Sequence, residues 1–234
     1  MKKMILLTSL CFGTAVSAPA ALYSSTYYKS GFANSGNIPD GNVSPWSDTR
    51  TVSGITESSI VSVSVRLNVS GGFNGDLYGY LSYNGVLVPL LNRVGVGAGN
   101  PAGYGDAGLN VTFTDGTANN IHFYQSVGSY SISGGAAWQP DGRTINPVTS
   151  SPSAFDAAGT VTFAAFSGMN PNGDWSLVLA DVSLGGGQAT VLNWGLDINA
   201  VPEPVNVALG LFAGLFGVAQ LVRRLHRRGI LVAG

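Results

Sequence analysis

The sequence predicts an all-β fold, a β-sandwich or jelly roll, and three observations carry this prediction. Apolar and polar residues alternate with a period of two over several short stretches, as they do in strands with one buried and one solvated face. Turn dipeptides such as Asn-Gly and Asp-Gly separate these stretches. No stretch between the two ends of the chain has a helical period of useful length.

The clearest strand is expected at residues 60–69. Its odd-numbered residues from Val61 to Val69 are all apolar, which predicts one buried face, and the intervening residues are polar. An edge strand is expected before it, near 49–52. The segment 21–37 has little regularity and is interpreted as an irregular lead-in to the folded body.

A hairpin is expected next, because Leu77–Tyr83 and Val86–Asn92 flank Asn84 and Gly85. Asn-Gly readily adopts the positive φ angles of a tight hairpin turn. The remaining strands are expected at 109–113, 120–124, 160–165, 175–181 and 191–198. The segment 128–152 is rich in Gly, Ser and Pro and is interpreted as a long loop with a short ordered piece.

The N-terminal residues 1–20 have the layout of a secretory signal peptide. Lys2 and Lys3 are followed by an apolar run to Val16 and then by small residues, with an A-x-A cleavage site at Ala18 and Ala20. We therefore expect a signal helix that signal peptidase removes. The alternative is a permanent anchor, but the apolar run is shorter than a membrane span requires.

The C-terminal residues 201–228 also look like a targeting segment. Pro202, Glu203 and Pro204 precede eighteen mostly apolar residues, 205–222, which would form a helix of about 27 Å and are expected to be transmembrane. A basic end, 223–228, follows, and its arginines favour a cytoplasmic side. These membrane-stop residues are Arg223, Arg224, Arg227 and Arg228. A short tail, 229–234, ends the chain; an unprocessed anchor is the alternative.

The body between the two targeting segments is acidic and free of cysteine. Residues 22–204 contain five basic and all twelve acidic residues of the chain, which argues against a nucleic-acid partner. The chain's one cysteine, Cys11, lies in the signal peptide, so no disulfide is expected in the body. About 180 residues are enough for one domain with its own core.

The body offers little catalytic chemistry. His122 is its only histidine and is interpreted as a face or edge residue of a short strand, not as a base. No G-x-S-x-G elbow, cysteine nucleophile or zinc-spaced histidine pair occurs. We therefore expect no catalytic residues and a chain that is not an enzyme. The alternative is a sugar-processing groove lined by aromatic residues, for which the candidates are Tyr80, Tyr83, Tyr104 and Tyr124.

A structural calcium ion is the one cofactor considered. Hard cations bind carboxylate and carbonyl oxygens, and several aspartates lie near expected strand ends or turns. The calcium candidates are Asp76, Asp115, Asp174 and Asp181. Asp106 also lies near an expected strand end or turn. No D-x-D-x-D-G loop is present, so solvated turn acids are the alternative. Trp175 and Trp194 are expected to anchor the core.

The body, residues 38–199, resembles the P domain, also called P/Homo B, of subtilisin-like proprotein convertases. The landmarks in family order are I-P-D-G-N at 38–42, G-D-L at 75–77, L-L-N-R at 90–93, T-F-T-D at 112–115, F-S-G at 166–168, G-D-W-S-L-V-L-A-D at 173–181 and L-N-W-G-L-D-I at 192–198. The resemblance implies a β jelly roll that accompanies a protease domain, which this chain lacks. Thr114 replaces an acidic residue of the family pattern.

The C-terminal segment resembles the sorting signal of PEP-CTERM proteins, which combines a Pro-Glu-Pro motif, a transmembrane segment and a short Arg-rich end. Pro202–Pro204, 205–222 and 223–228 match these parts in order. The resemblance implies export in a Gram-negative bacterium, transient anchoring in the inner membrane and processing by an exosortase-type sorting protease. It implies a destination in the cell envelope or the extracellular polysaccharide (biofilm) matrix.

These expectations combine into a non-catalytic exported protein that acts as a structural, adhesive or binding module, with matrix polysaccharide as a candidate partner. Two alternatives stay open. One is an accessory P domain that acts in trans with a separate subtilisin-like protease. The other is a polysaccharide-processing enzyme with an unrecognised site.

Overall fold

A computed structural model describes residues 20–227 of the chain. The expected signal peptide therefore lies outside the described residues as far as residue 19. Arg228 and the tail 229–234 lie outside them as well.

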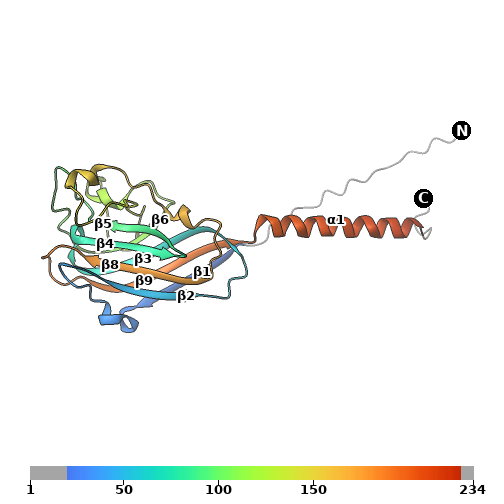
Figure 1. Cartoon of the computed structure of the whole chain (residues 1–234), viewed down its shortest axis with the longest axis horizontal. Coiled ribbons are helices and arrows are strands. Elements are labelled where there is room, and N and C mark those ends of the chain that lie inside the picture. The colour runs from blue at the N-terminus through green and yellow to red at the C-terminus, as the bar shows by residue number, and fades with distance from the viewer. Residues whose placement is uncertain (1–19, 228–234) are drawn as a thin grey trace.

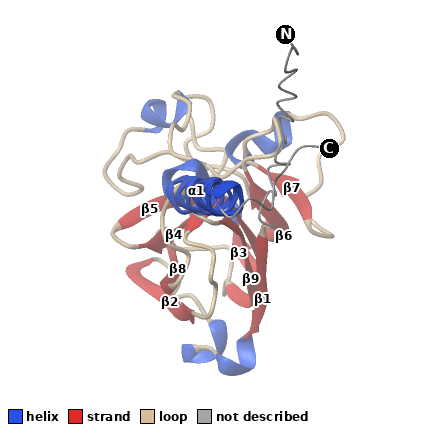
Figure 2. Cartoon of the chain, turned by 90° about the vertical axis from the view of Figure 1, so that its right-hand side faces the viewer, coloured by secondary structure: helices blue, strands red, loops and turns tan. Residues whose placement is uncertain are grey.

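Nine strands in the described part of the chain form two sheets (Figure 1). The first sheet has the order β1 (Ala21–Tyr28), β9 (Thr190–Val201), β3 (Ser59–Phe73), β6 (Ala107–Thr114) and β7 (Ala136–Trp138). The second has the order β2 (Asn42–Val52), β8 (Gly173–Asp181), β4 (Leu77–Tyr83) and β5 (Val86–Asn92). All pairs are antiparallel except β6 with β7. The end-on view in Figure 2 shows the sheets as two facing layers, so the predicted all-β sandwich is confirmed.

The core fills the space between the layers. One continuous cluster of buried side chains draws on the inward faces of both sheets. Trp175 on β8 and Trp194 on β9 are both completely buried in it. The ring of Trp175 stacks on Tyr83, with 3.9 Å between centroids and 5° between planes.

Strand β3 contains a bulge that changes which valine is buried. Its register against β9 shifts between Ile60 and Ser62. Ile60 therefore points into the core, whereas Val61, expected on the buried face, is 57% exposed. From Val63 to Val69 the odd-numbered residues are buried as expected. A β-bulge has this effect because one extra residue reverses the alternation of faces.

Residues 21–28, expected to be irregular, form strand β1 at the edge of the first sheet. The strand pairs with β9 from Ala21 opposite Ala200 to Tyr28 opposite Asn193. Its side chains alternate between half-buried and exposed, so the hydrophobic pattern is weak. An edge strand with one solvated face needs few apolar residues, which is why the pattern did not reveal it.

Six short 3-10 helices lie in the connections, and two of them replace predicted strands. They are η1 (Lys29–Gly31), η2 (Ala33–Gly36), η3 (Asn74–Asp76), η4 (Ile121–Ser126), η5 (Pro152–Asp156) and η6 (Phe163–Phe166). The strands expected at 120–124 and 160–165 are wrong, because η4 and η6 occupy these segments. Asn120 caps η4 and Thr162 caps η6 through their side-chain oxygens, and such caps favour a helical turn over a strand.

The predicted hairpin between β4 and β5 is confirmed. Asn84 and Gly85 have φ angles of 48° and 78°, as a two-residue hairpin turn with two positive φ values requires. Glycine meets this requirement without strain, and asparagine tolerates it better than most other residues.

Helix α1 (Pro204–Arg227) follows β9 and projects away from the sandwich (Figure 1). Between Leu209 and Val222 it contributes no residue to the core, and its large apolar side chains there are at least half exposed. Among the described residues, no helix is both long enough and apolar enough to cross a membrane. The helix expected at 205–222 is present, but its assignment as transmembrane is not supported.

Candidate functional site

The structure brings only two of the four calcium candidates together. Asp76 and Asp181 lie next to each other at one end of the sandwich, since Asp181 is paired with Leu77 across the sheet. Asp115 and Asp174 lie elsewhere. Asp174 is exposed on β8 and accepts a 2.6 Å hydrogen bond from the Thr51 hydroxyl.

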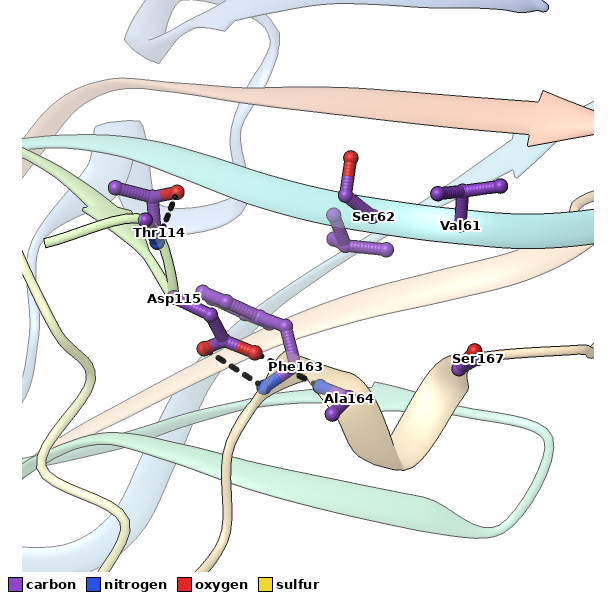
Figure 3. A pocket seen from close by; sticks show the side chains of 9 residues that line it. Val61, Ser62, Thr114, Asp115, Phe163, Ala164 and Ser167 are labelled. Atoms are coloured by element: carbon purple, nitrogen blue, oxygen red, sulfur yellow. Dashed lines mark hydrogen bonds between the residues drawn. The ribbon is translucent and has the colours of Figure 1, made fainter.

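Asp115 lines a surface cavity of about 340 Å³ and holds the start of η6 (Figure 3). Its two carboxylate oxygens accept hydrogen bonds from the amides of Phe163 (3.1 Å) and Ala164 (2.9 Å) at the start of η6. Ser62 and Ser167 also line the cavity, but its lining contains no histidine. Hydroxyl groups and a carboxylate that accepts bonds from the start of η6 therefore line the cavity, and no histidine is beside them to activate a nucleophile.

The position of Asp181 follows from the alternation of strand β8. Trp175, Leu177 and Leu179 point into the core, and Asp181 occupies the next inward position at the end of the strand. Asp76 ends η3, directly before β4, and its backbone carbonyl accepts a 2.9 Å bond from the amide of Val182. The pairing of β4 with β8 thus holds the two carboxyl groups at the same edge.

This edge is opposite to helix α1. Strand β3 begins at Ser59 beside Val201, the last residue of β9, and runs through the sheet to Phe73. Asp76 follows three residues later. We call the group Asp76, Asp181 and the neighbouring Asp40 the acidic end of the sandwich.

Asp181 is completely buried, and neither of its carboxylate oxygens has a hydrogen-bond partner. Burial, reinforced by the nearby carboxylates of Asp76 and Asp40 and opposed by the backbone amide of Ser183, raises its pKa from the ordinary value of 3.8 to about 6. Burial also raises the pKa of Asp76, against the opposing effects of Arg93 and Ser183. Ionising this end is therefore costly.

A cavity of about 290 Å³ opens beside the acidic end. Its lining includes Phe73, Asp76, Arg93, Tyr104, Ser183 and Leu184. The Arg93 guanidinium lies 4.0 Å from an oxygen of Asp76, and its Nε donates to the carbonyl of Gly75 (3.3 Å). A Cβ on Gly75 would lie 2.6 Å from the backbone nitrogen of Tyr104, so only glycine lets the loop 102–105 pass this close.

Replacing Asp181 with Asn should stabilise the metal-free protein at neutral pH. A carboxyl whose folded pKa lies above its unfolded value favours the folded state only while protonated. That contribution is complete below pH 4 and is lost as the pH rises through about 6. Asp181→Asn should therefore exceed the wild type by roughly 2–3 kcal/mol near pH 7.5 and approach it near pH 4.

Urea unfolding in a chelating buffer at several pH values measures this difference. Asp174→Asn is the matched control, because Asp174 is exposed and should show no such pH-dependent gain. A difference between Asp181→Asn and wild type that stays constant from pH 4 to 7.5 would contradict the prediction.

A second buried charged group, which the sequence reasoning missed, links three loops. His122, Asp141 and Arg143 are almost fully buried, so His122 is not the face or edge residue that was expected. The Asp141 carboxylate lies 2.7 Å from Nδ1 of His122 and accepts a 3.0 Å bond from Arg143. Nε2 of His122 lies 2.9 Å from the carbonyl of Val96.

The polar groups of this cluster have hydrogen-bond partners within the protein, and the cluster is almost inaccessible to solvent. Asp141 also accepts from the amide of Asn92, and Arg143 donates from Nε to the carbonyl of Phe155 (2.9 Å). Because both ring nitrogens of His122 already face oxygen acceptors and the ring is inaccessible, it has no free position for a substrate proton. In the sequence, the only sign of this buried cluster is that Asp141 and Arg143 are two residues apart in a loop with few charges.

The four tyrosines considered for a sugar groove do not form one. Tyr83 and Tyr124 are buried, and Tyr104 packs edge-on against Tyr124 with 4.6 Å between centroids. The Tyr124 hydroxyl donates a 2.8 Å hydrogen bond to Asp106, so this further calcium candidate has a hydrogen-bond partner in the protein. Among residues 20–227, no three His, Cys, Asp or Glu side chains are arranged as a metal-binding group.

The junction between the sandwich and α1 is the last part of the molecule with a predicted role. Strand β9 ends at Val201, and Pro202 and Glu203 form an accessible, non-regular link before the helix begins at Pro204. The Pro-Glu-Pro motif therefore lies where the fold of the sandwich is already complete.

The class of protein that these features define is a two-sheet β-sandwich with a projecting C-terminal helix.

No protein-family model and no curated protein matches the chain significantly. A solved chain from the crystal structure of the Aeromonas sobria serine protease in complex with the chaperone ORF2 is similar at 14% identity and a TM-score of 0.44, covering 80% of this chain and 28% of that chain.

The crystal structure of the Aeromonas sobria serine protease alone is similar at 14% identity and a TM-score of 0.43. That match covers 78% of this chain and 27% of the protease chain. The chain thus spans less than a third of the length of the solved chains that it matches.

Proposed function

We propose that this chain is an exported, non-catalytic β-sandwich module that a sorting protease delivers to the cell envelope or extracellular matrix by acting at the Pro-Glu-Pro junction. The observation that carries the proposal is the separation of the two parts at this junction. The sandwich has a complete core without α1, and the link between them is accessible. Cutting there would remove the helix and leave the folded module intact.

The amino-acid sequence supports the same function from both ends of the chain. The signal-peptide pattern at 1–20 fits export, and the motif at 202–204 followed by an apolar stretch and arginines resembles a sorting signal. An exosortase-type protease is the partner that this resemblance suggests. Matrix polysaccharide is the candidate ligand of the released module.

The non-catalytic part of the proposal rests on the chemistry of the described residues. His122, the body's only histidine, is enclosed by its partners, and Asp115 is engaged at the start of η6. Nucleophilic catalysis needs an accessible hydroxyl or thiol with a base in reach. We therefore expect the module to act by binding.

Removing α1 should leave the stability of the sandwich unchanged. A chain that ends at Val201 should unfold within about 2 °C of the full chain, because surface changes away from the core cost little. Thermal unfolding of both forms tests this. As a control, a chain that ends before β9 should not fold, since that strand pairs with both β1 and β3. A loss of more than about 5 °C on removing α1 alone would contradict the proposal.

Processing itself is tested in cells with and without the sorting protease. Mass spectrometry of the mature protein should place a new C-terminus in or next to 202–204 only when the protease is present. The same C-terminus in both strains would exclude the protease as the partner. Binding of the released module to purified matrix polysaccharide would then define its role.

A second candidate function is an accessory module for a separate subtilisin-like protease. The observation that favours it is the ordered set of P-domain landmarks, above all 75–77, 173–181 and 192–198, which spans most of the sandwich. Co-purification with a protease that lacks such a module, and a change in that protease's stability on mixing, would support this role over the first.

A further inference from the structure

We propose that the acidic end of the sandwich is a binding site for a hard divalent cation, calcium by its chemistry, with Asp181 and Asp76 as the carboxylate ligands. This goes beyond the proposed function, because it assigns a ligand to a part of the fold far from the Pro-Glu-Pro junction. Asp181 is buried without hydrogen-bond partners, other carboxylates are near it, and oxygen atoms line the adjacent cavity.

Two aspartates of the sandwich, Asp141 and Asp181, are completely buried but have different surroundings. Asp141 accepts hydrogen bonds or ion pairs from His122, Arg143 and the amide of Asn92. Asp181 is equally inaccessible, yet both of its oxygens lack a partner. A buried carboxylate without partners costs several kcal/mol, so buried charges are normally paired or coordinate metals. Asp181 is the carboxylate in this comparison that still needs a positive partner.

The surroundings of Asp181 carry an excess of negative charge. Asp40 and Asp76 are close enough to Asp181 to act on its ionisation, and Arg93 lies 4.0 Å from Asp76. When all groups are ionised, the three carboxylates outnumber the guanidinium by two. One divalent cation balances this excess. The side chain of Arg93 is held away by its bonds to the carbonyls of Gly75 and Pro147, so it does not reach Asp181 to act as the partner.

The chemistry of the groups at the acidic end favours calcium over zinc. The candidate metal ligands at this end are all oxygen atoms, from carboxylates, the Ser183 hydroxyl and the backbone of the loop 102–105; the Arg93 guanidinium, which cannot ligate a cation, also lines the cavity. Calcium takes six to eight oxygen ligands and accepts carbonyls and waters freely, whereas zinc prefers His and Cys. Since only two carboxylates lie next to each other, water and carbonyl oxygens complete the shell. Asp76 and Ser183 line the cavity of about 290 Å³, which leaves room for these ligands beside Asp76. Asp181 is next to Asp76 at the end of the paired strand and does not itself line the cavity.

The experiment is thermal unfolding and isothermal titration calorimetry of the full chain after EGTA treatment, with calcium chloride and, separately, magnesium chloride. Calcium at about 5 mM, above the usual range for extracellular sites, should raise the unfolding temperature by about 2–9 °C. Asp174→Asn, an exposed aspartate on the same strand, should keep this shift. Asp181→Asn should lose it, although it is more stable than the wild type in EGTA.

Asp76→Asn provides a second variant if Asp181→Asn does not fold. It should bind calcium at least tenfold more weakly than the wild type, because it removes one of two carboxylates. The proposal is overturned if calcium neither shifts the unfolding temperature of the wild type nor gives heat in calorimetry. An equal calcium shift in wild type and Asp181→Asn overturns it too. None of these results bears on processing at 202–204.

Discussion

Replacing Asp141 with Asn is expected to cost about 3–5 kcal/mol of unfolding free energy. The carboxylate of Asp141 holds His122 at 2.7 Å and Arg143 at 3.0 Å in a region from which water is excluded. Asparagine has nearly the same shape, so the loss comes from charge and not from packing. The guanidinium of Arg143 stays buried without its counter-ion, and removing one partner of a buried ion pair costs far more than the pair itself contributes.

The same substitution should loosen three loops. Through this cluster, the carbonyl of Val96, the helix η4 and the carbonyl of Phe155 are joined to Asp141. Hydrogen exchange should therefore increase in the segments around these residues before it increases in the strands of the sandwich. Urea denaturation gives the free energy, and exchange measured by mass spectrometry gives the location.

Asp156→Asn is the matched control for this experiment. Asp156 is exposed and accepts hydrogen bonds from the amide of Ala98, so its charge is solvated and its replacement should cost less than about 1 kcal/mol. If Asp141→Asn were as mild as Asp156→Asn, the buried cluster would have no role in stability. Uniform acceleration of exchange over the whole sandwich would contradict its local role in fixing loops.

Truncating Trp175 to Ala is expected to cost about 3–5 kcal/mol. The indole ring is completely buried, stacks on Tyr83 at 3.9 Å and meets Phe166 edge-on with 5.1 Å between centroids. Its removal leaves a cavity between the two sheets that neighbouring strands cannot fill. Large-to-small core substitutions lose both the transfer energy of the removed atoms and the contacts of the cavity wall.

Trp175→Phe separates packing from hydrogen bonding. The phenyl ring keeps the stack on Tyr83 but loses the 3.0 Å bond that the indole donates to the carbonyl of Pro171. We expect an intermediate cost of roughly 1–2 kcal/mol. Leu87→Ala, in an edge strand and 48% exposed, should cost less than either. An effect of Trp175→Ala no larger than that of Leu87→Ala would show that the sandwich core does not depend on this ring.

The parts of the fold that were predictable are those set by neighbours along the chain. Alternation of apolar residues marks β8 up to Asp181, and Asn84-Gly85 fixes a hairpin turn by its backbone preferences alone. These signals are local because strand faces and turn angles depend on adjacent residues. The same logic placed Asp76 and Asp181 near strand ends, where they were two of four candidate calcium ligands.

Other features depend on contacts that no local pattern encodes. Strand β1 exists because β9 offers it an edge, and Val61 is exposed because β3 bulges against the same strand. Residues 120–124 form η4 and not a strand, since the side chain of Asn120 caps the turn and His122 is drawn toward Asp141. Apart from the Asn120 cap, which is local, these are tertiary contacts between residues that are not neighbours in the sequence.

The sequence by itself determined that this is an all-β module between two targeting-like ends, with an acidic, cysteine-free body. It also identified the Pro-Glu-Pro motif and the aspartates worth testing. Only the tertiary structure decided which aspartates meet: it gave Asp115 to the start of η6 and Asp174 to solvent, and it buried Asp181 beside Asp76 without a partner. The reason is physical, because burial and pairing are properties of strand register and loop packing, and these are settled between residues about a hundred positions apart.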